Sequence, residues 1–294
     1  MGRLQTGDIL VFKAGDDWVG KTIAWLTDSN VSHAAMMLSP ITMVEMGSNG
    51  IHAGHVEELD GDGSILLRLH PEQPSVPLEC AAERYTESKT RYDFPALAFL
   101  AGLIIYRRIR PTPKLVAITD LVLRTACVAL DHLIQSVILK NPGPAMVCSQ
   151  LVYQIYEECG SDYHLKIESG LFQAVNDTDT ADGYICLADL ADTASDYDFA
   201  AFANDSAPVE EEELARELYH ALTEPETNGV METAAVDLGG LPSWTKRFLE
   251  KLEDFLEKSE SNIPLNALFV TPADLAYKTT NLTTVTKLDI KRIK

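Results

Sequence analysis

The stretch MVCSQLVYQIYEECG, residues 146–160, decides how this chain is interpreted. It predicts an amphipathic helix that ends near Gly160, because three apolar side chains fall on one face at helical spacing: Leu151, Ile155 and Tyr156. Cys148 stands at the start of that helix. Unpaired N–H groups and the helix dipole favour a thiolate at this position, and the thiolate is the reactive form of cysteine. The competing interpretation is a small buried thiol without a chemical role.

Composition narrows the classes of function. A chain of 294 residues with 46% hydrophobic composition can bury a full core. Its five cysteines are widely spaced and form neither a CxxC pair nor a Cys/His cluster, so we expect reduced thiols, no metal site and no cofactor. The net charge of −20 disfavours nucleic acid as a partner, because the overall field repels it.

A nucleophilic cysteine needs a base and a third group that orients the base. His33 and Glu45 are the candidates, on the strand-like runs SHAAMML (32–38) and TMVEMG (42–47). A three-residue loop at 39–41 pairs Ala35 with Glu45 and leaves the carboxylate diagonal to His33 on the same face. A register that pairs His33 directly with Glu45 also puts the two on one face, whereas a one-residue shift separates them. A carboxylate within an apolar strand also requires a partner.

The runs around this hairpin predict further elements. TGDILVF (6–12) indicates a turn followed by a strand, and SILLRLH (64–70) a strand after the turn-like DGDG. Trp18 and Trp25 are seven apart, so we expect one buried helical face, with a substrate groove as the alternative. For His52 and His55, in IHAGH, we expect surface or loop roles rather than metal binding.

Two further regions have a helical pattern. Residues 92–140 predict a helical hairpin, broken by the prolines of RPTPK at 110–114. Its apolar segment is shorter than the roughly 18 residues of a membrane span, although the basic tip of the 94–139 hairpin allows peripheral membrane contact. Residues 176–262 are expected to form an acidic, mainly helical insertion. It ends in an amphipathic helix with four apolar positions: Phe248, Leu252, Phe255 and Leu256.

Five short motifs, taken in order, are similar to a known family. The series TGDILVF, SHAAMML, MVEMGSNGI, VCSQLVYQIYEECG and TPADL resembles the YiiX-like permuted branch of the NlpC-type papain-fold hydrolases, which includes lecithin retinol acyltransferase relatives. The resemblance covers roughly residues 5–70, 140–172 and 263–287. The family's Cys-Ser-Glu-Leu motif matches the chain from Cys148, with Gln150 where glutamate is usual.

The resemblance implies an α+β fold: a circularly permuted papain-like (NlpC-type) domain, with an antiparallel sheet packed against the nucleophile helix and with helical insertions. The catalytic domain would comprise residues 1–175 and 263–294. The helical hairpin at about 92–140 and the acidic segment 176–262 would interrupt it.

The resemblance also implies acyl transfer through a thioester, with Cys148, His33 and Glu45 as the catalytic set. The expected enzyme is a cysteine hydrolase of the peptidase or amidase type that acts on an amide bond of a murein-type peptide. A lipid or acyl ester or thioester hydrolase or acyltransferase is the first alternative, with an acyl lipid as substrate. A catalytically silent binding or structural module is the second. The backbone N–H of Cys148 is the expected oxyanion donor.

The expected location is cytoplasmic. MGRLQTGDILVF contains no apolar run of signal-peptide length. A murein-type substrate would therefore require a specialised export route. The sequence makes no prediction of oligomeric state.

Overall fold

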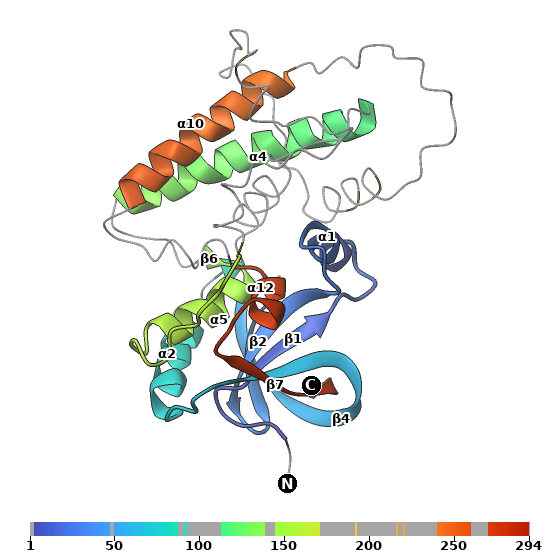
Figure 1. Ribbon diagram of the computed structural model, residues 1–294, viewed down its shortest axis with the longest axis vertical. Helices are drawn as coiled ribbons and strands as arrows, with labels where there is room; N and C mark the ends of the chain where they lie inside the picture. Colours follow the sequence, from blue (N-terminus) through green and yellow to red (C-terminus); the bar gives the residue numbers. More distant parts are fainter. Residues whose placement is uncertain are drawn as a thin grey trace.

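The computed structural model describes residues 3–47, 50–87, 91–92, 113–138, 145–170, 240–259 and 270–293, together with Asp192, Arg216 and His220. These residues form a mixed α+β structure in which helices pack around one antiparallel sheet (Figure 1). Most of the acidic segment 176–239, and the first arm of the expected hairpin at 93–112, lie outside the described residues. The predicted α+β class is confirmed at this level.

The main sheet has five strands in the order β1 (Ile9–Lys13), β2 (Val31–Ser39), β3 (Thr42–Gly47), β4 (Gly50–Leu69) and β7 (Leu282–Ile293). All neighbours are antiparallel, and β1 pairs with both β2 and β4, so the first four strands close on themselves. Strand β7 runs beside nearly the whole length of β4. Residues 282–293 therefore lie beside residues 55–69, although the two segments are far apart in the sequence.

The prediction of a separate strand at 64–70 is wrong in one respect. Strand β4 is continuous through DGDG, which makes a shift in register against β7 between Leu59 and Ser64 instead of a turn. The Asp289 side chain fills the space here and accepts a hydrogen bond from the Gly63 N–H at 2.7 Å. A Cβ at Gly61 would lie 2.0 Å from the Asp289 carboxylate, so the close approach requires glycine.

The turn before β1 contains a buried ion pair. Gly7 has a φ of 85°, and Asp8, 1% exposed, receives both Arg68 Nε at 2.6 Å and Arg68 Nη2 at 2.7 Å. Asp8 also accepts the Gln5 N–H at 2.7 Å, and the Tyr156 hydroxyl donates to the Gly7 carbonyl. These contacts join the start of β1, the end of β4 and helix α5 (Cys148–Glu157).

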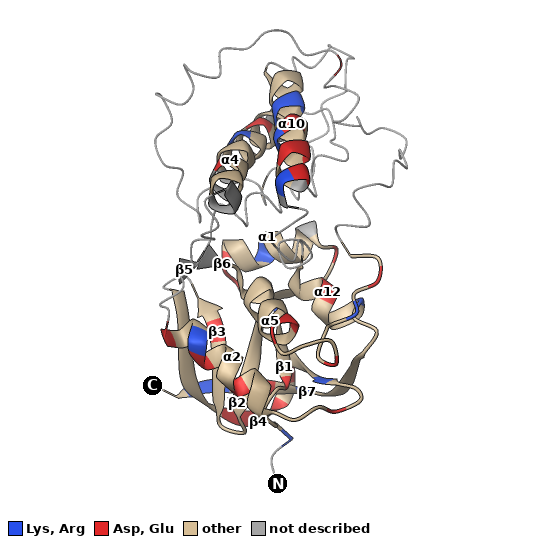
Figure 2. Ribbon diagram, turned by 90° about the vertical axis from the view of Figure 1, so that its left-hand side faces the viewer, with Lys and Arg blue, Asp and Glu red and all other residues tan. Residues whose placement is uncertain are grey.

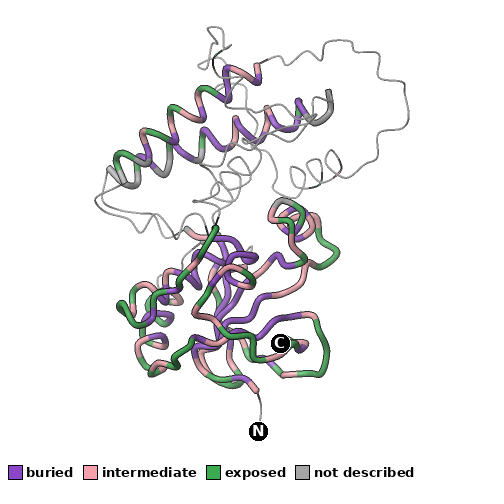
Figure 3. The backbone as a smooth tube through the Cα atoms, viewed as in Figure 1, coloured by how far each residue is buried: buried purple, intermediate pink, exposed green. Residues whose placement is uncertain are grey.

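The main core lies between the sheet and α5. Helices α2 (Val76–Glu87) and α12 (Pro272–Tyr277) pack around α5, and the short parallel pair β5 (Arg91–Tyr92) and β6 (Ala145–Met146) leads the chain into it. Three α5 side chains predicted to share one face are fully buried: Leu151, Ile155 and Tyr156. Figure 3 shows this burial concentrated where α5 meets the strands.

A second helical layer consists of α4 (Pro113–Ile138) and α10 (Leu241–Ser259), which lie side by side (Figure 1). The predicted apolar face of α10 is buried at Phe248, Leu252 and Phe255, while the Leu256 side chain lies outside the description. Acidic and basic residues line the rest of α10 (Figure 2). The sequence analysis predicted the two helices in separate insertions. In the structure they pack on each other, because each has one apolar stripe.

No helix among the described residues is both long enough and apolar enough to cross a membrane. The apolar run 94–105, on which the expected membrane contact of the 94–139 hairpin depends, falls outside those residues.

We expect Asp8→Asn to lower the free energy of unfolding by about 3 kcal/mol, because it leaves the Arg68 guanidinium half-buried without a counter-charge. Urea denaturation measures the change. Glu57→Gln is the matched control, since its partner Lys291 is 62% exposed and such surface pairs contribute at most about 1 kcal/mol. Equal effects of the two substitutions would contradict a structural role for the buried pair.

Candidate active site

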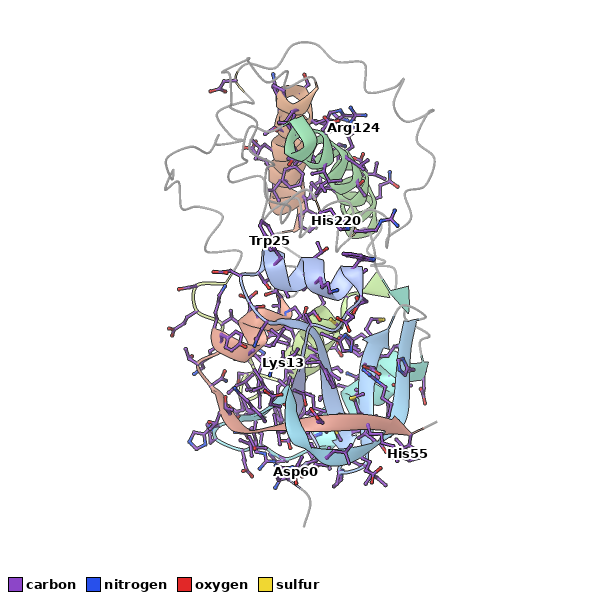
Figure 4. All side chains as sticks on the ribbon, turned by 90° about the vertical axis from the view of Figure 1, so that its right-hand side faces the viewer. Lys13, Trp25, His55, Asp60, Arg124 and His220 are labelled. Atoms are coloured by element: carbon purple, nitrogen blue, oxygen red, sulfur yellow. The ribbon has the colours of Figure 1, made fainter. Side chains whose placement is uncertain are left out.

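Cys148, His33 and Glu45 line one cavity of about 720 Å³. It lies between the start of α5, the strands β1 to β3 and helix α1 (Trp18–Leu26), with Arg292 of β7 at its edge. In Figure 4, Lys13 marks the β1 side of this region, and Trp25 and His220 lie at α1. The structure therefore brings all three predicted catalytic residues together.

The start of α5 holds Cys148 in place. The Val147 N–H donates to Gln150 Oε1 at 3.0 Å, so the Gln150 amide satisfies a buried backbone donor. Ser149, which the sequence suggested would support the helix start, donates from Oγ to the Val270 carbonyl at 2.7 Å and joins α5 to the returning chain. Cys148 itself is 5% exposed, and that exposure faces the cavity.

The predicted register of the hairpin is confirmed: Ala35 pairs with Glu45. Glu45 therefore lies diagonal to His33, and His33 Nε2 meets Glu45 Oε2 at 2.7 Å. Since Nε2 is held by the carboxylate, Nδ1 is the ring nitrogen left to interact with Cys148, which lines the same cavity and whose charge acts on His33. The three groups form a chain from carboxylate to imidazole to thiol.

Charges within this chain shift the pKa of each member. Burial alone would lower the pKa of His33, but the Cys148 thiolate and the Glu45 carboxylate outweigh burial and raise it to about 10. Burial would raise the pKa of Cys148, yet the His33 charge, together with the backbone N–H groups of Ala34 and Ser149, lowers it. The charge of an imidazolium at His33 and that of a thiolate at Cys148 therefore stabilise each other.

Two residues that the sequence did not assign to the site bind the same carboxylate. Arg292 grips Glu45 with Nε at 2.8 Å from Oε1 and Nη2 at 2.7 Å from Oε2. His52 is exposed, as expected for a surface position, and its Nε2 also lies 3.0 Å from Oε1, while His55 is exposed beside Thr42. Despite the penalty of burial, His33 and Arg292 hold the pKa of Glu45 well below its usual range.

The expectation for the two tryptophans is also corrected. Trp18 is half-buried and lines the cavity, and Trp25 is 43% exposed, so the pair does not form one buried face. The Trp18 ring also contacts that of His220, with centroids 4.8 Å apart and the two planes tilted by 46°. The substrate-groove alternative fits Trp18, and periodicity alone could not separate an apolar wall of a cavity from a core face.

No protein-family model, curated protein or solved structure matches this chain. Among the described residues, no group of three or more His, Cys, Asp and Glu side chains is arranged to hold a metal ion. The site itself supplies three groups: the Cys148 thiol, the His33 imidazole as a proton carrier, and the Glu45 carboxylate that is fixed on it.

We expect Cys148 to react with iodoacetamide at pH 6 at least about tenfold faster than Cys80, because an ordinary thiol is almost fully protonated at that pH. Cys80 is the internal control, since it is exposed and lies on α2, away from the cavity. Mass spectrometry of labelled peptides gives both rates in one sample.

His33→Ala should remove this advantage, because the imidazolium no longer favours the thiolate. Cys148 labelling no faster than Cys80 in the parent protein, or labelling indifferent to His33, would contradict the ion pair.

Proposed function

We propose that this protein is a cysteine hydrolase that transfers acyl groups through a thioester on Cys148. The observation that carries the proposal is the chain of contacts from Glu45 through His33 to Cys148 at the wall of an open cavity. A nucleophile, a base within hydrogen-bond reach and a group that orients the base are the parts that such a mechanism requires.

The order of elements supports a fold proposal as well. The histidine strand β2 precedes helix α5, and the antiparallel sheet packs on the helix that begins at the nucleophile. We infer a circularly permuted papain-like (NlpC-type) domain, completed by β7 after the helical pair. In that arrangement the two helices α4 and α10 come from insertions on either side of α5.

The reaction proceeds in two balanced steps. The Cys148 thiolate attacks the substrate carbonyl carbon, and the C–N bond breaks as the His33 imidazolium gives its proton to the leaving amine. Neutral His33 then takes a proton from water, whose oxygen attacks the thioester carbon, and the C–S bond breaks to release a carboxylic acid and the Cys148 thiolate. Glu45 keeps the Nε2 side of the ring engaged, so Nδ1 stays directed at the sulfur.

The oxyanion formed in each step needs N–H donors. The Cys148 N–H belongs to the first residue of α5, and a helix offers no internal carbonyl partner to its first N–H groups. This N–H group lies at the positive end of the helix dipole, where developing negative charge is favoured. The backbone N–H groups of Ala34 and Ser149 stabilise the thiolate before it attacks the substrate.

An amide bond in a murein-type peptide is the first substrate class we propose. Lys13, Asp17 and Ser32 line the cavity beside the catalytic groups. Charges of both signs suit a peptide that carries free carboxylate and amino groups. The net charge of the chain adds no general attraction for such a substrate, so recognition rests on these local contacts.

A second candidate, an acyl ester or thioester, is favoured by one wall of the same cavity. Helix α1 contributes Trp18, Val19 and Ile23 there, an apolar surface that could hold an acyl chain. The same thioester chemistry would then hydrolyse the acyl group or pass it to another acceptor.

The alternative of a silent binding module is less well supported. A module without catalysis has no physical need to bury a carboxylate against an imidazolium that faces a thiolate, since a buried charge network is costly to maintain.

We expect the protein to cleave an amide bond in purified murein peptides, releasing new amino and carboxyl ends, and Cys148→Ala to reduce this rate at least about a thousandfold. Liquid chromatography with mass spectrometry detects the products. Cys80→Ala is the matched control and should retain the parent rate.

Graded acyl esters tested in parallel separate the two substrate classes. Cys148-dependent turnover of long-chain esters without peptide cleavage would replace the amide proposal with the acyl one. Turnover of neither, with Cys148 no more reactive than Cys80, would contradict the hydrolase.

A further inference from the structure

We propose that Arg292, on the last strand of the chain, is a positioning residue for the Cys148 reaction: it holds Glu45 as an oriented carboxylate through the catalytic cycle. This inference rests on the proposed function and adds to it a residue far from the nucleophile in sequence. Arg292 acts through Glu45 and His33, without touching the reacting sulfur.

The contacts are those of a planar fork. Arg292 Nε and Nη2 reach the two oxygens of Glu45 at 2.8 and 2.7 Å, and one of these oxygens, Oε2, also receives His33 at 2.7 Å. A bidentate pair of this kind restrains the plane of the carboxylate as well as its position. The oxygen that meets His33 is thus fixed relative to the imidazole ring.

Arg292 is itself held from two sides. In β7 it pairs with Val56 of β4, and its guanidinium carbon lies 5.4 Å from the centre of the Phe12 ring. Its neighbour Lys291 instead pairs with Glu57 on the surface. Consecutive residues of the strand therefore point to opposite faces of the sheet, and of these two it is Arg292 that reaches the site.

The permanent charge of arginine matters most when His33 is neutral. During the first step His33 gives up its proton, and the Glu45 carboxylate, 3% exposed, loses a positive neighbour. A buried carboxylate without a counter-charge would compete for protons, because burial favours its neutral form. Arg292 remains charged at every stage, so Glu45 stays an anion and the proton of His33 goes to the leaving group.

The groups that face Glu45 come from three strands. They are His33 on β2, His52 on β4 and Arg292 on β7, and Cys148 on α5 lies beyond His33. His52 also contacts Oε1, but a histidine can lose its charge within the working range of pH, whereas an arginine cannot. Arg292 is therefore the partner that keeps a positive charge beside Glu45 when the imidazole is neutral.

The test compares Cys148 alkylation by iodoacetamide at pH 5 and pH 8 in the full chain. In Arg292→Met, Glu45 is no longer fixed against His33, so the imidazolium stabilises the thiolate less at low pH, and the ratio of the rate at pH 5 to the rate at pH 8 should fall about tenfold. Arg292→Lys retains the charge without the fork and should fall by less. Lys291→Met, on the same strand, should keep the parent ratio.

Two results would overturn the role of Arg292. One is an unchanged ratio in Arg292→Met, and the other is an equal loss of rate at both pH values, which identifies a purely structural contribution. Should Arg292→Met fail to fold, Arg292→Lys is measured in its place. A pH 5 to pH 8 ratio equal to that of the parent, or an equal loss of rate at both pH values, would then overturn the role.

The parent protein separates this inference from the proposed function. If parental Cys148 is fast and depends on His33 while Arg292→Met matches it, only the role of Arg292 falls. If parental Cys148 reacts like Cys80 and ignores His33, the hydrolase falls as well.

Discussion

The buried carboxylate of Glu45 is the constraint on which the site depends. A charge at 3% exposure is tolerated only when its oxygens are occupied by donors, and here His33, His52 and Arg292 occupy them. These donors come from β2, β4 and β7, so the carboxylate can be satisfied only after the sheet has assembled. The same pairing that stabilises the charge also aims the imidazole at Cys148, which links the stability of the sheet to the chemistry of the site.

The helix start supplies the other half of the arrangement. Gln150 satisfies the Val147 N–H, Ser149 bonds to the Val270 carbonyl, and Cys148 is thereby held where the helix dipole favours a thiolate. A glutamate in place of Gln150 would put a buried negative charge within one turn of that thiolate and weaken it. The neutral amide makes the hydrogen bond without this repulsion, so Gln150 is compatible with the proposed nucleophile.

The cavity contains this polar site and also residues of helix α1, which the sequence analysis did not assign to the site. Helix α1 forms its apolar wall, and the Trp18 ring on that wall contacts the His220 ring of the acidic segment at a tilted angle. Beyond it, α4 and α10 pack their apolar stripes together (Figure 1). Amphipathic patterns predicted that each helix needs a partner, but they carry no information on which partner it takes. That choice is made by the shapes and the chain connections of the assembled molecule.

Local pattern was sufficient for several features. The apolar period of residues 148–157 predicted α5, and the short link between β2 and β3 predicted the pairing of Ala35 with Glu45, which places His33 and Glu45 on one face. These depend on residues near each other in the chain, where helical or strand geometry sets the spacing. By contrast, Arg292 showed no distinguishing local signal, and DGDG was predicted to be a turn, because its partner Asp289 lies far along the chain. The contact of β7 with β4 decides both cases, since residues distant in sequence meet only through tertiary pairing, and no local periodicity encodes which distant side chain will neutralise a buried charge.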